Sequence, residues 1–234
     1  MSKTYLIPEE VNQLKEAASN PRDRLLTTVL FRFGCRISEA LALTVDDFDF
    51  TRKMVTIKHL KSRTKLKCPG CKSDLSLSAV YCPKCGNKVE SAVKEVKERR
   101  KQRELPLDES IISLLRQYLE SGGGVVRDGK RLLFGINRHR AWQIIKNMAE
   151  KASLGSIINV ETGKLHHVSP HKLRDAFAVH AVKCNDTGDG LRMLQEHLGH
   201  ASFNTTAKYR KIAGEEHRKW YQELWTGGAN GPCN

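Results

Sequence analysis

The stretch SPHKLRDAFAVH, residues 169–180, indicates the fold of this 234-residue chain more clearly than any other. A proline at its start and apolar residues at helical spacing predict a helix over residues 170–183. His171 and Arg174 are three residues apart, so they lie on one face of this helix near its N-terminus. That face is a candidate functional surface.

Three other short segments carry residues of similar kinds. Arg36 follows a helix-breaking glycine in Gly34-Cys-Arg-Ile-Ser-Glu39, His200 ends Leu198-Gly-His, and Tyr209 comes nine residues after His200. Each segment is ordinary by itself, because helix arginines extend into solvent and tyrosines on amphipathic segments usually pack with the hydroxyl in water. A lone histidine is also more often structural than catalytic. The four segments in this order are far more specific.

This order resembles the tyrosine recombinase family, which includes phage integrases and Xer-type site-specific recombinases. The family pattern is an arginine after a glycine, a lysine on a β-hairpin, His-x-x-Arg, Leu-Gly-His, and a tyrosine about nine residues later. The run Arg-Glu-Leu-Pro-Leu at residues 103–107 is also similar to the second strand of the family's hairpin. The resemblance covers residues 5–225 and implies the family's catalytic-domain fold, mainly α with a small antiparallel β-sheet.

The resemblance implies a role for each matching residue. Tyr209 would attack DNA and form a 3′-phosphotyrosine, which preserves the bond energy, so the chemistry needs neither ATP nor a metal. Arg36 and Arg174 would clamp the phosphate oxygens, because two guanidinium groups can each bind them bidentately. His200 would donate a further hydrogen bond, and His171 would move a proton to or from the tyrosine or the leaving strand.

The leaving 5′ oxygen needs a proton, which family members take from a lysine on the hairpin. Lys61 is the candidate, since it follows Ile57, the end of the first predicted strand, by four residues. Lys65 is the alternative, because the many lysines near the hairpin tip obscure the register. Any one of these lysines could instead contact the DNA backbone.

The rest of the chain reads as helices with one small hairpin. Helices are predicted from Pro8 and from Pro21, where proline opens the helix, and strands at 54–57 and 104–107 are predicted to pair. Residues 153–168 read as an irregular or hairpin connection. Further helices are expected after Ile37 and at residues 109–119, 138–151, 190–198 and 215–225.

Four of the seven cysteines form two CxxC pairs, Cys68-Pro-Gly-Cys71 and Cys82-Pro-Lys-Cys85. Two such pairs a short loop apart match a tetrahedral four-thiolate zinc site, in which each turn presents two thiolates to one ion. Disulfides are the alternative, but the absence of an export signal favours a reducing compartment. We therefore expect one structural zinc ion and no catalytic metal, because four thiolates leave no open position.

Positive charge is concentrated around these cysteines. Residues 58–103 hold 14 Lys and Arg and 4 Asp and Glu, a net +10 of the formal +14 of the chain. Such a concentration favours a polyanion, and double-stranded DNA is preferred to a membrane surface because no wide apolar face accompanies the charge. The residues expected to contact DNA are Lys58, Arg63, Lys65, Lys67, Lys72, Lys84 and Lys88.

The domain organisation follows from these patterns. We expect one catalytic domain over residues 1–226, interrupted by a zinc-ribbon-like insertion at residues 62–103 in the β-hairpin, and a flexible tail at 227–234. We expect the sequence to begin at the catalytic domain, without the separate N-terminal core-binding domain of many family members. Either it is truncated, or the insertion supplies the missing grip on DNA.

The predicted C-terminal helix carries two i,i+4 pairs, Trp220 with Leu224 and Tyr221 with Trp225. This stripe could belong to the core of the same chain. The resemblance favours docking on a neighbouring copy, giving a dimer or tetramer on DNA.

The sequence excludes some classes of protein. No apolar run approaches the roughly 18 residues of a membrane span, and the start lacks the apolar region of a signal peptide, so a cytoplasmic, DNA-associated protein is expected. Two alternatives to a recombinase stay open. One is nicking and closing like that of a type IB topoisomerase, and the other is a zinc-dependent DNA-binding regulator with a vestigial active site.

Overall fold

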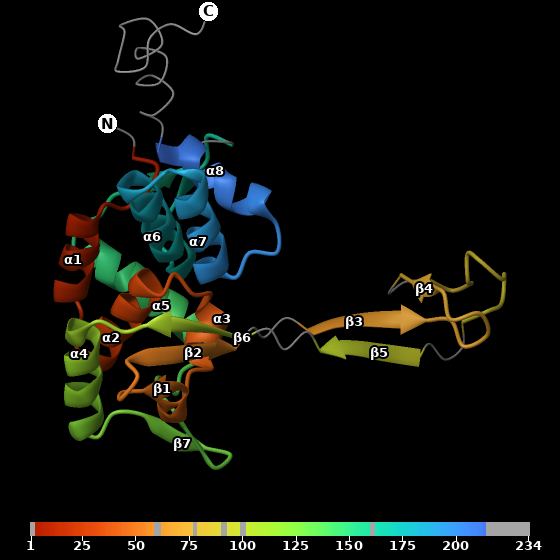
Figure 1. Ribbon diagram of the computed structural model, residues 1–234, viewed down its shortest axis with the longest axis horizontal. Coiled ribbons are helices and arrows are strands. Elements are labelled where there is room, and N and C mark those ends of the chain that lie inside the picture. The colour runs from red at the N-terminus through yellow and green to blue at the C-terminus, as the bar shows by residue number, and fades with distance from the viewer. Residues whose placement is uncertain are drawn as a thin grey trace, which may run out of the picture. The chain divides into compact units, whose positions relative to one another are not determined.

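The computed structural model describes residues 3–58, 62–76, 79–89, 93–98, 102–159 and 162–213 (Figure 1). The chain divides into two compact units. The first, here called the main unit, consists of Met1–Ile57 and Arg103–Asn234, and the second, here called the module, consists of Lys58–Gln102. The insertion was predicted at residues 62–103, and the module has nearly the same limits.

The helices are α1 (Pro8–Glu16), α2 (Pro21–Arg32), α3 (Ile37–Leu41), α4 (Glu109–Glu120), α5 (Arg138–Lys151), α6 (Pro170–Cys184), α7 (Gly188–Leu198) and α8 (Phe203–Ala213), with a 3₁₀ turn η1 (Val45–Asp47). The strands that lie wholly or mainly in the main unit are β1 (Phe48–Asp49), β2 (Met54–Lys58), β6 (Gln102–Pro106), β7 (Val125–Arg127), β8 (Lys130–Leu132), β9 (Ile157–Ile158) and β10 (Leu165–His166). Those of the module are β3 (Ser62–Lys67), β4 (Asp74–Leu75) and β5 (Val93–Glu98).

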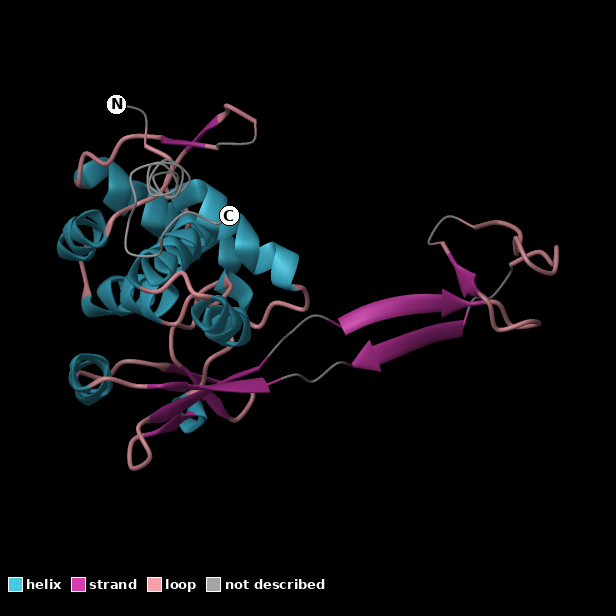
Figure 2. Ribbon diagram, turned by 45° about the horizontal axis from the view of Figure 1, so that its top comes forward, coloured by secondary structure: helices cyan, strands magenta, loops and turns pink. Residues whose placement is uncertain are grey.

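A small sheet of order β1-β2-β6 supports the main unit. Of the two segments predicted to pair, 54–57 falls on β2, and 104–107 falls on the neighbouring β6 except for its last residue, Leu107, which directly follows the strand. Val55 and Ile57 alternate with less buried residues along β2, and Leu105 of β6 is also buried. This alternation is typical of strands with one face on a core. Most helices of the main unit lie on one side of the sheet (Figure 2).

Helix α2 forms the centre of the larger hydrophobic core. Asn20 caps its N-terminus by accepting a hydrogen bond from the backbone N–H of Asp23, and Pro21 occupies the first turn, as its fixed φ favours. Its apolar positions are buried on several sides because α1, α4 and α6 all pack against it. The fully buried side chains are Leu25, Leu26, Val29 and Leu30.

A second, smaller cluster joins α6, α7 and α8. It contains Val179, Leu194, Leu198 and, from α8, Tyr209. The three helices contact one another, so they hold Tyr209 against the helix that carries His171 and Arg174. Helix α8 was not predicted as a helix from the sequence.

The module contains its own antiparallel sheet of order β4-β3-β5. Strand β3 pairs with β5 along its whole length, from Ser62 opposite Glu98 to Lys67 opposite Val93. The sequence predicted the two CxxC turns but not this sheet. Among the described residues, no helix is both long and apolar enough for a membrane crossing.

Candidate active site

Arg174 is a deeply buried charged residue of the site. Its side chain is 2% exposed although it carries a guanidinium. Nη1 donates to the carbonyl of Gly34 at 2.5 Å, and Nη2 donates to the carbonyl of Leu198 at 2.9 Å. Burial, and then the charge of Arg36, lower its pKa, but a guanidinium stays protonated at neutral pH. Arg174 therefore ties the ends of α2 and α7 to α6.

Two glycines make this convergence possible. Gly34 follows α2 with a φ of +52°, and a Cβ there would lie 2.6 Å from Cδ1 of Phe177 and 2.8 Å from Cδ2 of Leu198. Gly199 ends α7 with a φ of +65°, and a Cβ there would lie 3.0 Å from Nη1 of Arg103. Only glycine combines this backbone conformation with such close approach. The glycines of both motifs are thus explained by their positive φ and by close neighbours, Phe177 and Leu198 at Gly34 and Arg103 at Gly199.

His200 lies directly after the turn at Gly199. Its Nε2 is 2.8 Å from Nη2 of Arg174, and its Nδ1 is 2.8 Å from the hydroxyl of Thr206. Because a guanidinium can only donate, Nε2 must accept, and Nδ1 carries the proton and donates it to Thr206. Burial, and then the charges of Arg174 and Arg36, lower the pKa of His200 to about 4. The imidazole is therefore neutral at pH 7.

Tyr209 presents its hydroxyl to α6. The side chain is 1% exposed, and the hydroxyl donates to Oδ1 of Asp175 at 2.9 Å. Its ring also stacks near that of His200, with centroids 6.3 Å apart. Burial first, and then Asp175, raise the pKa of Tyr209 well above its ordinary value. The hydroxyl is consequently protonated at neutral pH.

Arg36 is held by a buried carboxylate. Glu39, whose side chain is 1% exposed, accepts from Nη1 of Arg36 at 3.0 Å and from Nη2 of Arg103 at 2.9 Å. Glu39 also accepts from the backbone N–H of Arg36, which precedes α3 as its N-cap. One acid thus orients two arginines from distant segments of the main unit.

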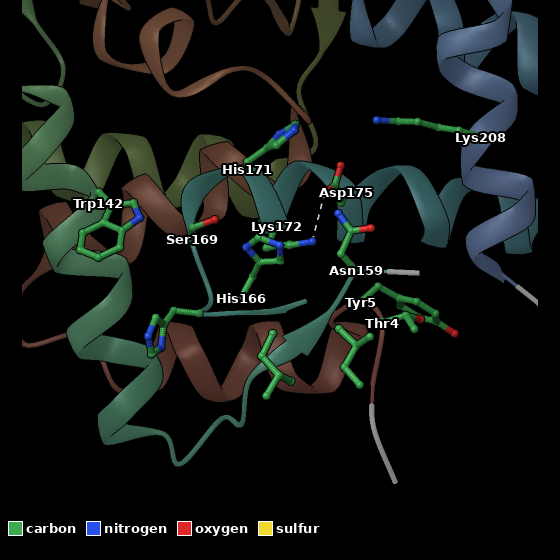
Figure 3. A pocket seen from close by; sticks show the side chains of 13 residues that line it. Thr4, Tyr5, Trp142, Asn159, His166, Ser169, His171, Lys172, Asp175 and Lys208 are labelled. Carbon is green, nitrogen blue, oxygen red and sulfur yellow. Dashed lines mark ion pairs between the residues drawn. The ribbon is translucent and has the colours of Figure 1, made fainter. Parts of the chain in front are cut away.

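His171 borders a cavity of about 450 Å³ at the N-terminal end of α6. Lys172 and Asp175 from α6 and Lys208 from α8 also line it (Figure 3). Desolvation lowers the pKa of His171, and the carboxylate of Asp175 opposes this shift. The cavity therefore opens beside the acceptor of the Tyr209 hydroxyl.

The structure brings together Arg36, Arg174, His200 and Tyr209, and it places His171 on the same helix as Arg174. Lys61 lies outside the described residues. Sequence reasoning missed Glu39, Asp175 and Thr206. Glu39 could have been found, because it follows Arg36 by three residues, the spacing of a capping box.

The predicted DNA-contacting residues belong to the module, including Lys58 at its first position. Lys72, Lys84 and Lys88 are exposed, whereas Lys67 forms an ion pair with Asp74. Arg63 and Lys65 belong to β3, and their side chains lie outside the described part.

The four predicted zinc ligands converge within the module. The Sγ atoms of Cys68, Cys71, Cys82 and Cys85 all lie within 4.8 Å of one another. The pairs Cys68–Cys85 and Cys71–Cys82 are 3.6 and 3.5 Å apart, far longer than a disulfide. Thiolates about 2.3 Å from a tetrahedral zinc ion are separated by about 3.8 Å, so the cluster fits this ion.

The surroundings of the cluster also suit a metal. The hydroxyl of Ser73 lies 3.1 Å from the Sγ atoms of both Cys71 and Cys82 and lowers the pKa of both thiols. Thiolates are the form that binds zinc, and the single proton of this hydroxyl, donated to one sulfur or the other, stabilises that form. The donor set can therefore hold a structural zinc ion.

Comparison with known proteins gives a consistent result. A model described as "Phage integrase family" matches residues 4–216. The tyrosine recombinase XerA of Thermococcus kodakarensis is 26% identical over 221 residues, covering 92% of this chain. The chain spans 60% of the length of that curated relative.

Solved structures show the same fold. A crystal structure of the XerA recombinase matches with a TM-score of 0.63 and 22% identity, covering 95% of this chain and 64% of the other. The XerH site-specific recombinase bound to a palindromic difH substrate matches with a TM-score of 0.61 and 22% identity, covering 97% and 54%. These matches confirm the predicted fold class and the family resemblance.

Proposed function

This chain belongs to the phage integrase family, and from that premise we propose that it cuts and rejoins double-stranded DNA at specific sites through a 3′-phosphotyrosine on Tyr209. The observation that best supports this function is the convergence of Arg174 on α6, His200 just after α7 and Tyr209 on α8, with the charge of Arg36 near enough to lower the pKa of Arg174 and of His200. A DNA-bound relative of the same fold supports DNA as the substrate.

The proposed chemistry assigns one role to each side chain. The hydroxyl of Tyr209 attacks the scissile phosphorus, and the phosphate oxygens are bound by the guanidinium groups of Arg36 and Arg174, which stabilise the charge of the transition state. A lysine of the hairpin region, Lys61 in our proposal, protonates the leaving 5′ oxygen. The phosphotyrosine keeps the bond energy for rejoining.

The side chains of Arg174 and His200 are hydrogen-bonded to each other before DNA binds. Nε2 of His200 accepts from Arg174 and cannot donate to a phosphate in this state. A bound phosphate adds negative charge, which raises the pKa of an adjacent imidazole. We therefore propose that His200 takes up a proton when the DNA binds, with Nδ1 still donating to Thr206 and Nε2 donating to the phosphate.

The module is proposed to be a zinc-stabilised DNA-binding element. The four cysteines would hold one structural zinc ion, and the exposed Lys72, Lys84 and Lys88 would contact the DNA backbone. In this proposal a catalytic domain over residues 1–226 carries the insertion, with the tail at 227–234. Self-association on DNA would use the helix predicted at 215–225, which lies outside the described residues.

A suicide DNA substrate tests the proposed function. Cleavage of such a substrate traps the covalent adduct, which migrates slowly on a denaturing gel. Wild type should form the adduct, and Tyr209→Phe should not, although its DNA affinity should be nearly unchanged because only one hydroxyl is removed. Tyr118→Phe is the matched control, since Tyr118 donates to the carbonyl of Leu133 in the other core. Adduct formation by Tyr209→Phe would contradict the proposal.

A further inference from the structure

The hydroxyl of Tyr209 has one proton to donate, and the structure directs it to a residue outside the family pattern. The acceptor is Oδ1 of Asp175, at 2.9 Å. His171, which the resemblance suggested as a proton carrier for the tyrosine or for the leaving strand, precedes Asp175 by one helical turn on α6. The position of the proton therefore points to a carboxylate rather than to an imidazole.

Burial makes Asp175, rather than bulk water, the available acceptor for the proton of Tyr209. Tyr209 is 1% exposed, so bulk water has little access to its side chain. The pKa of the hydroxyl is raised by desolvation and by Asp175, which keeps the nucleophile neutral until it reacts. A neutral phenol that attacks phosphorus must lose its proton during the attack, and the base must already be within hydrogen-bond reach.

The other side of Asp175 faces charge and open space. Nζ of Lys172 lies 4.0 Å from Oδ2 of Asp175, and both residues line the cavity of about 450 Å³ (Figure 3). The lysine leaves Oδ1 to the tyrosine. The cavity gives small solutes a route to the carboxylate.

We propose that Asp175 is the general base that takes the proton of Tyr209 during DNA cleavage; this inference rests on the proposed function. The bond from Oη of Tyr209 to phosphorus forms as the bond from phosphorus to the 5′ oxygen breaks. The phenolic proton passes to Oδ1 of Asp175, and the 5′ oxygen takes a proton from the general acid. In rejoining, the 5′ hydroxyl attacks phosphorus and gives its proton back to the general acid, while the bond from phosphorus to Oη of Tyr209 breaks and Asp175 returns the proton to Oη. A carboxylate plays this part toward a hydroxyl nucleophile in protein kinases.

The main variant for the test is Asp175→Asn. An asparagine can still accept the hydrogen bond of Tyr209 through its amide oxygen, but it cannot take the proton. The rate of adduct formation on a suicide substrate should fall by roughly 100- to 10,000-fold, the usual contribution of a general base. DNA affinity, measured by gel shift, should not weaken. Asp128→Asn is the matched control, because Asp128 is exposed in the turn between β7 and β8.

Asp175→Ala provides a second, independent measurement. It leaves a space beside the cavity, so added formate should restore adduct formation in a concentration-dependent manner, whereas acetamide at the same concentration should not. A 5′-phosphorothiolate substrate, whose sulfur leaves without a proton, should rescue a variant of the general acid but not Asp175→Asn.

The possible outcomes separate the two proposals. Absence of an adduct in wild type would overturn the proposed function itself. With the wild-type adduct present, a rate for Asp175→Asn equal to or above that of wild type would overturn the general base and mark the contact as a restraint on the nucleophile. A slow Asp175→Ala that formate does not restore would also overturn it.

Discussion

The carbonyl oxygen of Gly34 accepts a hydrogen bond from Nη1 of Arg174 across 2.5 Å. This hydrogen bond joins two motifs that are 140 residues apart in the sequence. Because the same guanidinium also holds the carbonyl of Leu198, Arg174 has a structural role besides the proposed chemical one. Arg36, whose side chain is 31% exposed, is the arginine whose chemical role can be tested with less effect on the fold.

Arg36→Lys should slow DNA cleavage much more than it weakens DNA binding. A lysine keeps the charge but lacks the bidentate fork that fits two phosphate oxygens. Removal of one such donor should lower the rate of adduct formation by roughly 100- to 1,000-fold. Single-turnover cleavage and gel shift measure the two effects separately. Arg192→Lys, at an exposed ion pair on α7, is the control. Equal reductions of rate and affinity would identify Arg36 as an ordinary phosphate contact.

Gly34→Ala should destabilise the main unit and reduce cleavage together. The left-handed backbone costs a non-glycine residue about 1–2 kcal/mol, and the added Cβ would also press on Phe177 and Leu198. Any shift of the Gly34 carbonyl misplaces Arg174. Urea unfolding measures the stability, and Gly155→Ala, where a Cβ would meet no atom within 4 Å, is the control. A Gly34→Ala variant as stable as wild type would show that the backbone turn is not required.

The sequence predicts where the helices of this site begin better than it predicts the contacts between their side chains. Prolines at residues 8, 21 and 170 mark helix starts because their fixed φ suits the first turn, and α1, α2 and α6 begin there. The pairing of Tyr209 with Asp175 spans 34 residues and depends on how α8 packs on α6, which no local spacing encodes. Helix α8 itself was missed because its threonines and scattered polar residues give little helical periodicity. Strand β3, Ser-Arg-Thr-Lys-Leu-Lys, likewise offers no apolar alternation.

The stability of the main unit should fall as the pH drops from about 6.5 towards 4. The pKa values of His197 and His200 are both lowered to about 4. For His197 the cause is burial first, and then the charges of Arg103 and Arg174. Between these pH values the two histidines bind protons in the unfolded state but not in the folded state, so a lower pH favours unfolding. The slope is at most about 1.4 kcal/mol per pH unit for each ring, and less for partly exposed rings.

His197→Leu should reduce the dependence of stability on pH between about 6.5 and 4. The ring of His197 stacks on Phe177 with centroids 4.7 Å apart, and leucine keeps an apolar contact there without a titrating group. Urea unfolding at a series of pH values measures the slope for wild type and variant. His139→Leu, on the exposed start of α5, is the control and should keep the wild-type slope. Identical slopes for wild type and His197→Leu would show that folding does not change proton binding by His197, and hence that its pKa is not lowered in the folded state.

Removal of zinc should weaken DNA binding without removing the chemistry. Metal analysis should first find one zinc ion per chain, and Cys71→Ser should fail to hold it while Cys184→Ser, at an exposed cysteine outside the cluster, should keep it. Binding of a structural zinc ion stabilises the folded state, so the metal-free module should no longer be ordered and should no longer align its lysines. The salt dependence of DNA binding should then decrease by about 0.9 in log–log slope for each phosphate that the lysines no longer neutralise. Because zinc takes no part in the proposed reaction, a high concentration of substrate should still be cleaved.

A preparation without zinc would refute the metal site, and an unchanged salt slope after chelation would show that the module does not bind the DNA backbone.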